Sequence, residues 1–143
     1  MVCGDMLLNV RFTVSSWARV DAIGSDMSIF SKDNDAADPE IAFRAYIKSD
    51  GTLTAYFTDP TNLTDSETKS GTSSITAQQW TFVAISVDMD NGATSSTTSF
   101  IINDASEVAT STTTGKYWVD AAALINYVGT TRGTASNDFT DMF

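Results

Sequence analysis

The chain has 143 residues, of which 42% are hydrophobic, so it has the length and composition of one domain with its own core. Its 18 acidic and 8 basic residues give a formal net charge of -10, and no two basic residues are adjacent. These features argue against a nucleic-acid-binding protein, which needs clustered Lys or Arg to contact phosphates. No apolar stretch approaches a membrane span, and residues 1–10 lack the pattern of a signal peptide.

Two residue types that often carry chemistry are scarce. Histidine does not occur, which removes the commonest general base near neutral pH and the commonest zinc ligand. Cys3 is the single cysteine, so an internal disulfide and a cysteine-rich metal site are excluded. Ser and Thr make up about a quarter of the residues, a bias common in secreted, glycan-rich proteins.

Short runs of alternating apolar residues, separated by Gly, Asn and Asp, predict an all-β chain. In chain order, strands are predicted at residues 11–20, 27–31, 41–48, 53–58, 80–88, 100–102, 105–109 and 122–128. The sequence Ser49-Asp50-Gly51-Thr52 predicts a tight hairpin with a type I′ turn. Residues 59–74 predict a long irregular crossing between two sheets, and residues 93–99 a loop or a weak strand start.

The predicted strand over residues 80–88 is apolar on both faces. Trp80, Phe82 and Ala84 fall on one face, whereas Val83, Ile85 and Val87 fall on the other. Such a strand belongs in the middle of a stacked sheet, and the regular spacing of the others favours an antiparallel β-sandwich.

Taken in order, these strands resemble the laminin G-like and pentraxin-like group of the concanavalin A-like jelly rolls. Residues 79–88 (QWTFVAISVD) carry the strongest likeness, to the family's "x-W-x-x-V-A-(V/I)-x-x-D" strand. The other similar segments are 12–21 (FTVSSWARVD), 28–32 (SIFSK), 49–53 (SDGTL), 100–104 (FIIND) and 124–129 (LINYVG). The resemblance covers residues 12–143 and implies a concanavalin A-like β-sandwich jelly roll.

The two ends depart from the family pattern. Residues 1–10 do not match the usual opening strand and are interpreted as an N-terminal extension of a single domain over 1–143. The family's closing strand would begin where the sequence stops, at Phe143. Two hypotheses follow: the chain is a fragment of a larger protein, which we favour, or a neighbouring chain supplies the terminal strand by sheet-edge pairing, giving a homo-oligomer.

The acidic loop after residue 32 is a candidate calcium site. Hard cations bind carboxylate and carbonyl oxygens, and Asp33, Asn34, Asp35, Asp38 and Glu40 offer them. The resemblance implies calcium ligands in this loop, but the pentraxin-like "D-N-E" is here Asp38-Pro39-Glu40, and proline cannot coordinate through its side chain. The competing interpretation, a solvated acidic loop without calcium, is the one we favour.

Aromatic residues are the candidate glycan contacts, because sugars stack on exposed rings. Tyr117 and Trp118, beside a Thr-rich loop, are the predicted exposed pair, whereas Trp17 and Trp80 are expected in the core or on a sheet face. Asn62 begins the sequon Asn-Leu-Thr and is a candidate glycosylation site.

A hydrolase is disfavoured. Glycosidases of this jelly roll place two carboxylates on one strand in an "E-x-D-x-x-E" pattern, which is absent, and without histidine a serine triad is excluded. The sequence therefore predicts a non-enzymatic extracellular or cell-surface module for recognition or adhesion, with a glycan or an extracellular protein as partner. The alternative is a structural subunit of a glycosylated surface layer or filament, assembled by strand exchange.

Overall fold

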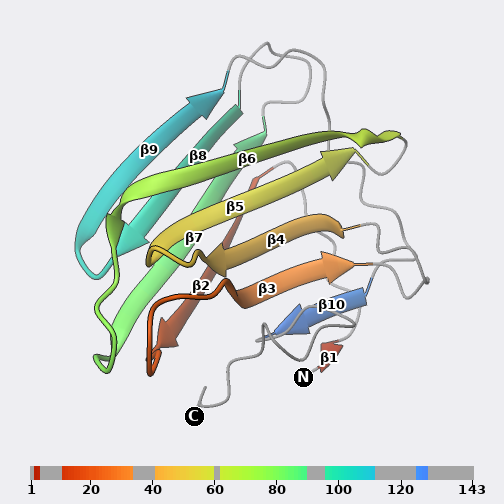
Figure 1. The fold of residues 1–143 in the computed structure, drawn as a ribbon. Helices are drawn as coiled ribbons and strands as arrows, with labels where there is room; N and C mark the ends of the chain where they lie inside the picture. The colour runs from red at the N-terminus through yellow and green to blue at the C-terminus, as the bar shows by residue number, and fades with distance from the viewer. Residues whose placement is uncertain are drawn as a thin grey trace.

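The computed structural model describes residues 2–3, 11–33, 41–59, 62–89, 96–111 and 125–128. Within these ranges the strands form two antiparallel sheets that pack as layers (Figure 1). One sheet has the order β1 (Val2–Cys3), β10 (Ile125–Val128), β3 (Met27–Asp33), β4 (Ile41–Ile47), β5 (Thr52–Asp59) and β6 (Asn62–Ser74). The other has the order β2 (Arg11–Ala18), β7 (Thr81–Met89), β8 (Ser96–Ile102) and β9 (Ala105–Ser111). The predicted all-β antiparallel sandwich is confirmed.

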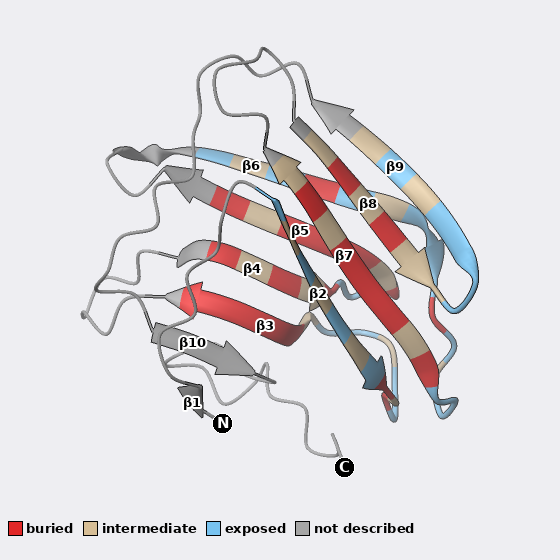
Figure 2. Ribbon diagram, turned by 180° about the vertical axis from the view of Figure 1, so that it is seen from behind, coloured by how far each residue is buried: buried red, intermediate tan, exposed pale blue. Residues whose placement is uncertain are grey.

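Strand β7 occupies the interior of its sheet, as its two apolar faces predict. It pairs with β2 on one side and β8 on the other. Val83, Ile85 and Val87 point into the sandwich and are buried, as Figure 2 shows along β7. A strand with neighbours on both edges satisfies all its backbone groups, so the most apolar segment of the chain lies where water is excluded.

Phe43 lies at the centre of the core and joins the two layers. Its side chain is fully buried on β4. Its ring contacts Phe12 of the opposite sheet edge-to-face, with ring centroids 5.0 Å apart. Phe30 and Phe57, from the neighbouring strands, lie 6.1 Å and 5.3 Å from it. Edge-to-face and tilted packing of this kind is preferred by aromatic rings, so this cluster fixes how the sheets are stacked.

The hairpin between β4 and β5 forms where predicted, but the type I′ turn is wrong. The Gly51 N–H donates to the Lys48 carbonyl at 2.8 Å, and the Lys48 N–H donates to the Thr52 carbonyl at 2.9 Å. Only Gly51 in this loop has a positive φ, of 87°, whereas type I′ needs two such residues. The loop is therefore a three-residue turn that ends in a left-handed glycine. Asp50 stabilises it by accepting hydrogen bonds from the Thr52 N–H and hydroxyl.

Residues 59–74 do not form the predicted irregular crossing. Most of them form β6, which pairs with β5 at the edge of the larger sheet. Their Ser- and Thr-rich sequence lacks apolar alternation because an edge strand covers little core. Lys69 covers the core at this edge, because its side chain is buried beside the Phe57 ring, with Nζ 6.0 Å from the ring centroid. This burial lowers the pKa of its ammonium group.

Glu107 joins the two sheets where β6 and β9 meet, at the upper left of Figure 1. Its carboxylate, on β9, accepts hydrogen bonds from the Thr72 N–H and from the Ser73 N–H and hydroxyl on β6. A Cβ at Gly71 would lie 3.0 Å from the Glu107 carboxylate and 3.3 Å from the Phe100 Cβ, so the close approach of the strands favours glycine there. We call Glu107, Gly71, Thr72 and Ser73 the Glu107 clasp.

The remaining predictions of elements have mixed outcomes. The strand over residues 122–128 is confirmed for Ile125–Val128, and the weak strand start within residues 93–99 is confirmed from Ser96 onward. Val2–Cys3, within the predicted N-terminal extension, pairs with β10. A search of the described ranges for a helix long and apolar enough to cross a bilayer finds none.

Candidate functional site

Most of the site residues predicted from the sequence lie outside the described residues, namely Tyr117, Trp118, Asn34, Asp35, Asp38 and Glu40. Asp33 is the last residue of β3 and Asn62 the first of β6, and their side chains are likewise not described. The structure therefore does not test the calcium, stacking or glycosylation predictions. Among the residues that are described, no group of three acidic or thiol side chains is arranged to hold a metal ion.

Trp17 and Trp80 are expected in the core or on a sheet face, and because both are exposed the core position is wrong. The exposed fractions are 58% for Trp17 and 52% for Trp80. The other expectation, a sheet-face position, is correct for Trp17, because alternation along β2 turns it outward while Ala18 is buried. The signal was present in the sequence: Trp17 is in phase with Arg11, Thr13 and Ser15, whose polar side chains mark the outer face.

Trp17, Phe82 and Trp80 lie together at one end of the β2–β7 pair, and we call them the aromatic platform. Trp17 and Phe82 are register partners, and their rings meet edge-to-face with centroids 5.6 Å apart. The Gln78 N–H donates to the Val20 carbonyl at 2.7 Å, so the chain that carries Trp80 runs beside the end of β2. The platform thus presents two large indole rings to solvent at this end of the sheet.

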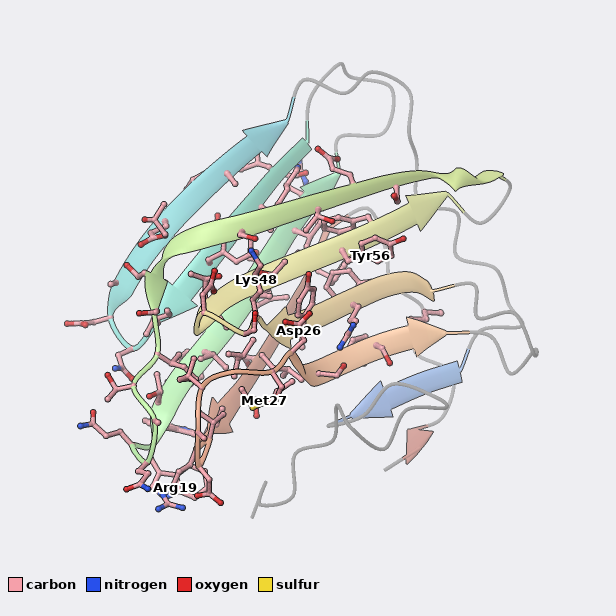
Figure 3. All side chains as sticks on the ribbon, viewed as in Figure 1. Arg19, Asp26, Met27, Lys48 and Tyr56 are labelled. Carbon is pink, nitrogen blue, oxygen red and sulfur yellow. The ribbon has the colours of Figure 1, made fainter. Side chains whose placement is uncertain are left out.

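Polar groups border the aromatic platform. The Asn103 side-chain oxygen accepts a hydrogen bond from the Phe82 N–H at 3.0 Å, and the Asn103 N–H donates to the Phe82 carbonyl at 2.7 Å. This fixes the Asn103 amide with its NH₂ group available to solvent or a ligand. At the same end of the molecule, below β2 in Figure 3, Arg19 contacts Asp21 at 3.3 Å. Exposed rings beside amide and charged groups suit a polar ligand with an apolar face.

A comparison with protein-family models shows which family this chain belongs to. The laminin G type 3 family model, described as "Concanavalin A-like lectin/glucanases superfamily", matches residues 3–141. The chain belongs to this superfamily. The resemblance stated from the ordered strand segments is therefore confirmed, and the protein is a laminin G-like domain.

This laminin G-like domain is also similar to a solved structure, the LG1-3 region of the laminin α2 chain. The TM-score is 0.57 at 12% sequence identity. The match covers 96% of the domain and 25% of the laminin chain, so the domain spans about a quarter of that structure. At this identity the likeness shows a shared fold. Comparison with curated proteins gives no match.

Away from the platform, the outer faces of the laminin G-like domain carry hydroxyl groups. Thr13 and Ser86 are register partners on β2 and β7 and share a hydrogen bond of 3.0 Å. On the other sheet, Thr54 and Ser70 do the same at 2.9 Å. The abundant Ser and Thr thus occupy outward strand positions as well as loops. Within the described outer faces, exposed indole rings occur only at the platform end of β2 and β7.

The described glutamates of the domain do not form a catalytic pair. Glu107 is held in the clasp, where the hydrogen bonds from Ser73 and Thr72 lower its pKa to about 2. Glu67 lies on the other sheet, with an oxygen 4.0 Å from the Lys69 ammonium group. A retaining glycosidase needs a general acid whose pKa is raised, whereas the pKa of Glu107 is lowered. Glu107 therefore does not suit that role.

Proposed function

We propose that this laminin G-like domain is a non-enzymatic extracellular recognition module that binds a glycan or protein ligand through the aromatic platform. The observation that carries the proposal is the exposure of Trp17 and Trp80 at one end of the β2–β7 pair. Burying a large aromatic side chain stabilises a protein by roughly 1.5–3 kcal/mol, so leaving two in water forgoes that gain. Exposed tryptophans are typical of interaction sites.

Composition and family support the extracellular location. The family resemblance implies a binding module outside the cell, and the Ser- and Thr-rich surface and the sequon at Asn62 agree with it. The acidic net charge argues against anionic membranes and sulfated polysaccharides as partners. A ligand with a flat apolar face and hydroxyl groups, such as a neutral sugar, fits the platform and Asn103 best.

Replacing Trp17 or Trp80 by Ala is expected to weaken ligand binding by roughly thirtyfold or more, since a hot-spot tryptophan contributes about 2 kcal/mol or more. A glycan array, followed by calorimetric titration with the best oligosaccharide, measures this. Val108→Ala is the matched control, because Val108 is 62% exposed on β9, at the other edge of the same sheet. If both tryptophan variants bind the ligand as tightly as the wild type does, the aromatic platform is not the binding site.

The same array, repeated with calcium chloride and with a chelator, tests the predicted ion site. Asp33, Asp35, Asp38 and Glu40 stay candidate ligands. If the loop holds calcium, binding or the thermal midpoint responds to calcium, and Asp35→Asn removes the response. An identical profile in both conditions supports the solvated acidic loop.

The strand-exchange alternative rests on one observation, the edge position of β2. In the described part of the chain β2 pairs with β7 alone, so its other edge can accept a strand. A structural subunit assembled in this way is expected to gain mass with concentration when measured by light scattering. A constant monomer mass over a hundredfold range of concentration contradicts it.

A further inference from the structure

Two turns beside the aromatic platform have a left-handed backbone. Asn103, directly after β8, has a φ of 53°, and Gln78, shortly before β7, has a φ of 64°. Within the part of the chain that the structure describes, no other residue except glycine has a positive φ. Side chains rarely tolerate this conformation, and the residues that adopt it cluster at binding and catalytic sites. The position of both turns therefore supports a site at the platform.

Asn103 is held by Phe82 through its backbone and its side chain. Its N–H donates to the Phe82 carbonyl at 2.7 Å, and its side-chain oxygen accepts the Phe82 N–H at 3.0 Å. The side-chain oxygen thus replaces a backbone carbonyl at the end of the β7–β8 ladder. Because the Phe82 ring also contacts Trp17, the Asn103 amide has a fixed place relative to the platform.

The group that Asn103 offers to a ligand is a hydrogen-bond donor. A primary amide has one acceptor oxygen and an NH₂ group with two donors. The Phe82 N–H occupies the oxygen, so the exposed side chain of Asn103 presents its NH₂ group to solvent. A ligand group at this place gains most when it accepts a hydrogen bond and has an apolar part, because exposed indole rings lie beside the donor.

Building on the function proposed above, we infer that the aromatic platform binds an N-acetylhexosamine, a neutral sugar that carries an acetamido group. The acetamido carbonyl accepts a hydrogen bond from the Asn103 NH₂ group, and the acetamido methyl packs against an exposed indole ring of the platform. The sugar ring stacks on the remaining aromatic surface. A plain hydroxyl group can accept the same hydrogen bond, but it has no methyl group to pack on the rings.

Two related groups are disfavoured at this position. The protonated amine of a glucosamine unit only donates hydrogen bonds, so it opposes the Asn103 NH₂ group, although the acidic domain attracts its charge. A carboxylate accepts hydrogen bonds, but the net charge of -10 repels it. The acetamido group is an uncharged acceptor with an apolar end, and it therefore matches both the donor and the rings.

The test compares chitotriose with cellotriose by calorimetric titration. These two trisaccharides share ring configuration and linkage, and they differ only in the acetamido or hydroxyl group next to the anomeric carbon. We expect chitotriose to bind roughly tenfold or more tightly, because one hydrogen bond and one buried methyl group together contribute at least that much. In NMR spectra of ¹⁵N-labelled protein, the side-chain amide signals of Asn103 should shift with chitotriose and saturate.

Variants of the turn assign the preference to Asn103. Asn103→Gly is expected to lower the affinity for chitotriose to that for cellotriose and to keep the fold, since glycine adopts the same positive φ. Asn103→Asp keeps the acceptor for the Phe82 N–H but replaces the donor by a second acceptor, so it should weaken chitotriose binding at least as much. Asp104→Asn, at the exposed next residue, is the matched control and should keep the preference.

Four outcomes would overturn the inference. Equal affinities for the two trisaccharides, in binding that Trp17→Ala abolishes, contradict the acetamido contact and leave the proposed function in place. A preference for chitotriose that survives in Asn103→Gly shows that Asn103 does not read the acetamido group. Tightest binding of the glucosamine trimer shows that charge selects the sugar. Failure of every glycan to bind leaves only a protein ligand for the platform.

Discussion

Replacing Phe43 by Ala is expected to lower the free energy of unfolding by about 3–5 kcal/mol. Phe43 is fully buried, and its ring contacts Phe12, Phe30 and Phe57. The substitution loses the transfer free energy of the ring and leaves a cavity between two sheets whose backbones are fixed by hydrogen bonds. Since domains of this size are stable by only about 5–15 kcal/mol, the variant should be close to unfolding at 37 °C.

Urea denaturation followed by tryptophan fluorescence measures this loss. Val108→Ala removes a similar kind of surface from an exposed position and should change the stability by less than about 0.5 kcal/mol. A loss below about 1 kcal/mol in Phe43→Ala would mean that the ring cluster does not hold the sheets together.

Replacing Glu107 by Gln is expected to remove much of the pH dependence of stability in acid. The folded-state pKa of Glu107 is lowered to about 2 from an ordinary value of 4.5, because its carboxylate accepts hydrogen bonds from Ser73 and Thr72. A lowered carboxyl pKa means that the unfolded chain binds the proton more readily. The contribution of Glu107 to stability is therefore complete above pH 4.5 and is lost as the pH falls toward 2.

Thermal midpoints of the wild type and Glu107→Gln, measured from pH 7 to pH 2, check this. The difference should be largest at pH 7 and should shrink below pH 4.5. Ser106→Ala, an exposed neighbour on β9, is the control. Adding Ser73→Ala to Glu107→Gln should cost less than it does in the wild type, since the two residues share a hydrogen bond. A difference that is constant over the whole range would show that the carboxylate charge has no part in the clasp.

The strands of the core could be predicted from the sequence because their inner faces alternate. In β2, β4, β5 and β7, every second residue is apolar or small and lies against the opposite sheet. Strand β6 could not be predicted in this way. Its 13 residues are mostly polar, and its position depends on backbone pairing with β5 and on a carboxylate more than 30 residues further along the chain. Local sequence does not report such contacts.

The candidate sites also differ in how far they could be predicted from the sequence. The outward position of Trp17 follows from its phase with polar residues on β2, and a stricter use of that phase would have predicted its exposure. On the larger sheet, the pairing of Arg44 with Tyr56 and of Ser28 with Tyr46 depends on the register of neighbouring strands. Neither pairing can be derived from the strands taken singly. The predicted Tyr117, Trp118 and acidic-loop sites lie outside the described residues and stay predictions.

The pairing of β2 with β7 has a kinetic consequence. Arg11 and Asp88 meet across 77 residues of sequence, and the whole length of β2 depends on partners that far away. During synthesis β2 leaves the ribosome before β7 and must wait for it, while the hairpins of β3 to β6 can form in between. Loop closure of this span is slow, and an unpaired strand is exposed to aggregation in the meantime. The polar side chains of Arg11, Thr13 and Ser15 on the outer face of β2 therefore disfavour aggregation of this strand before it pairs with β7.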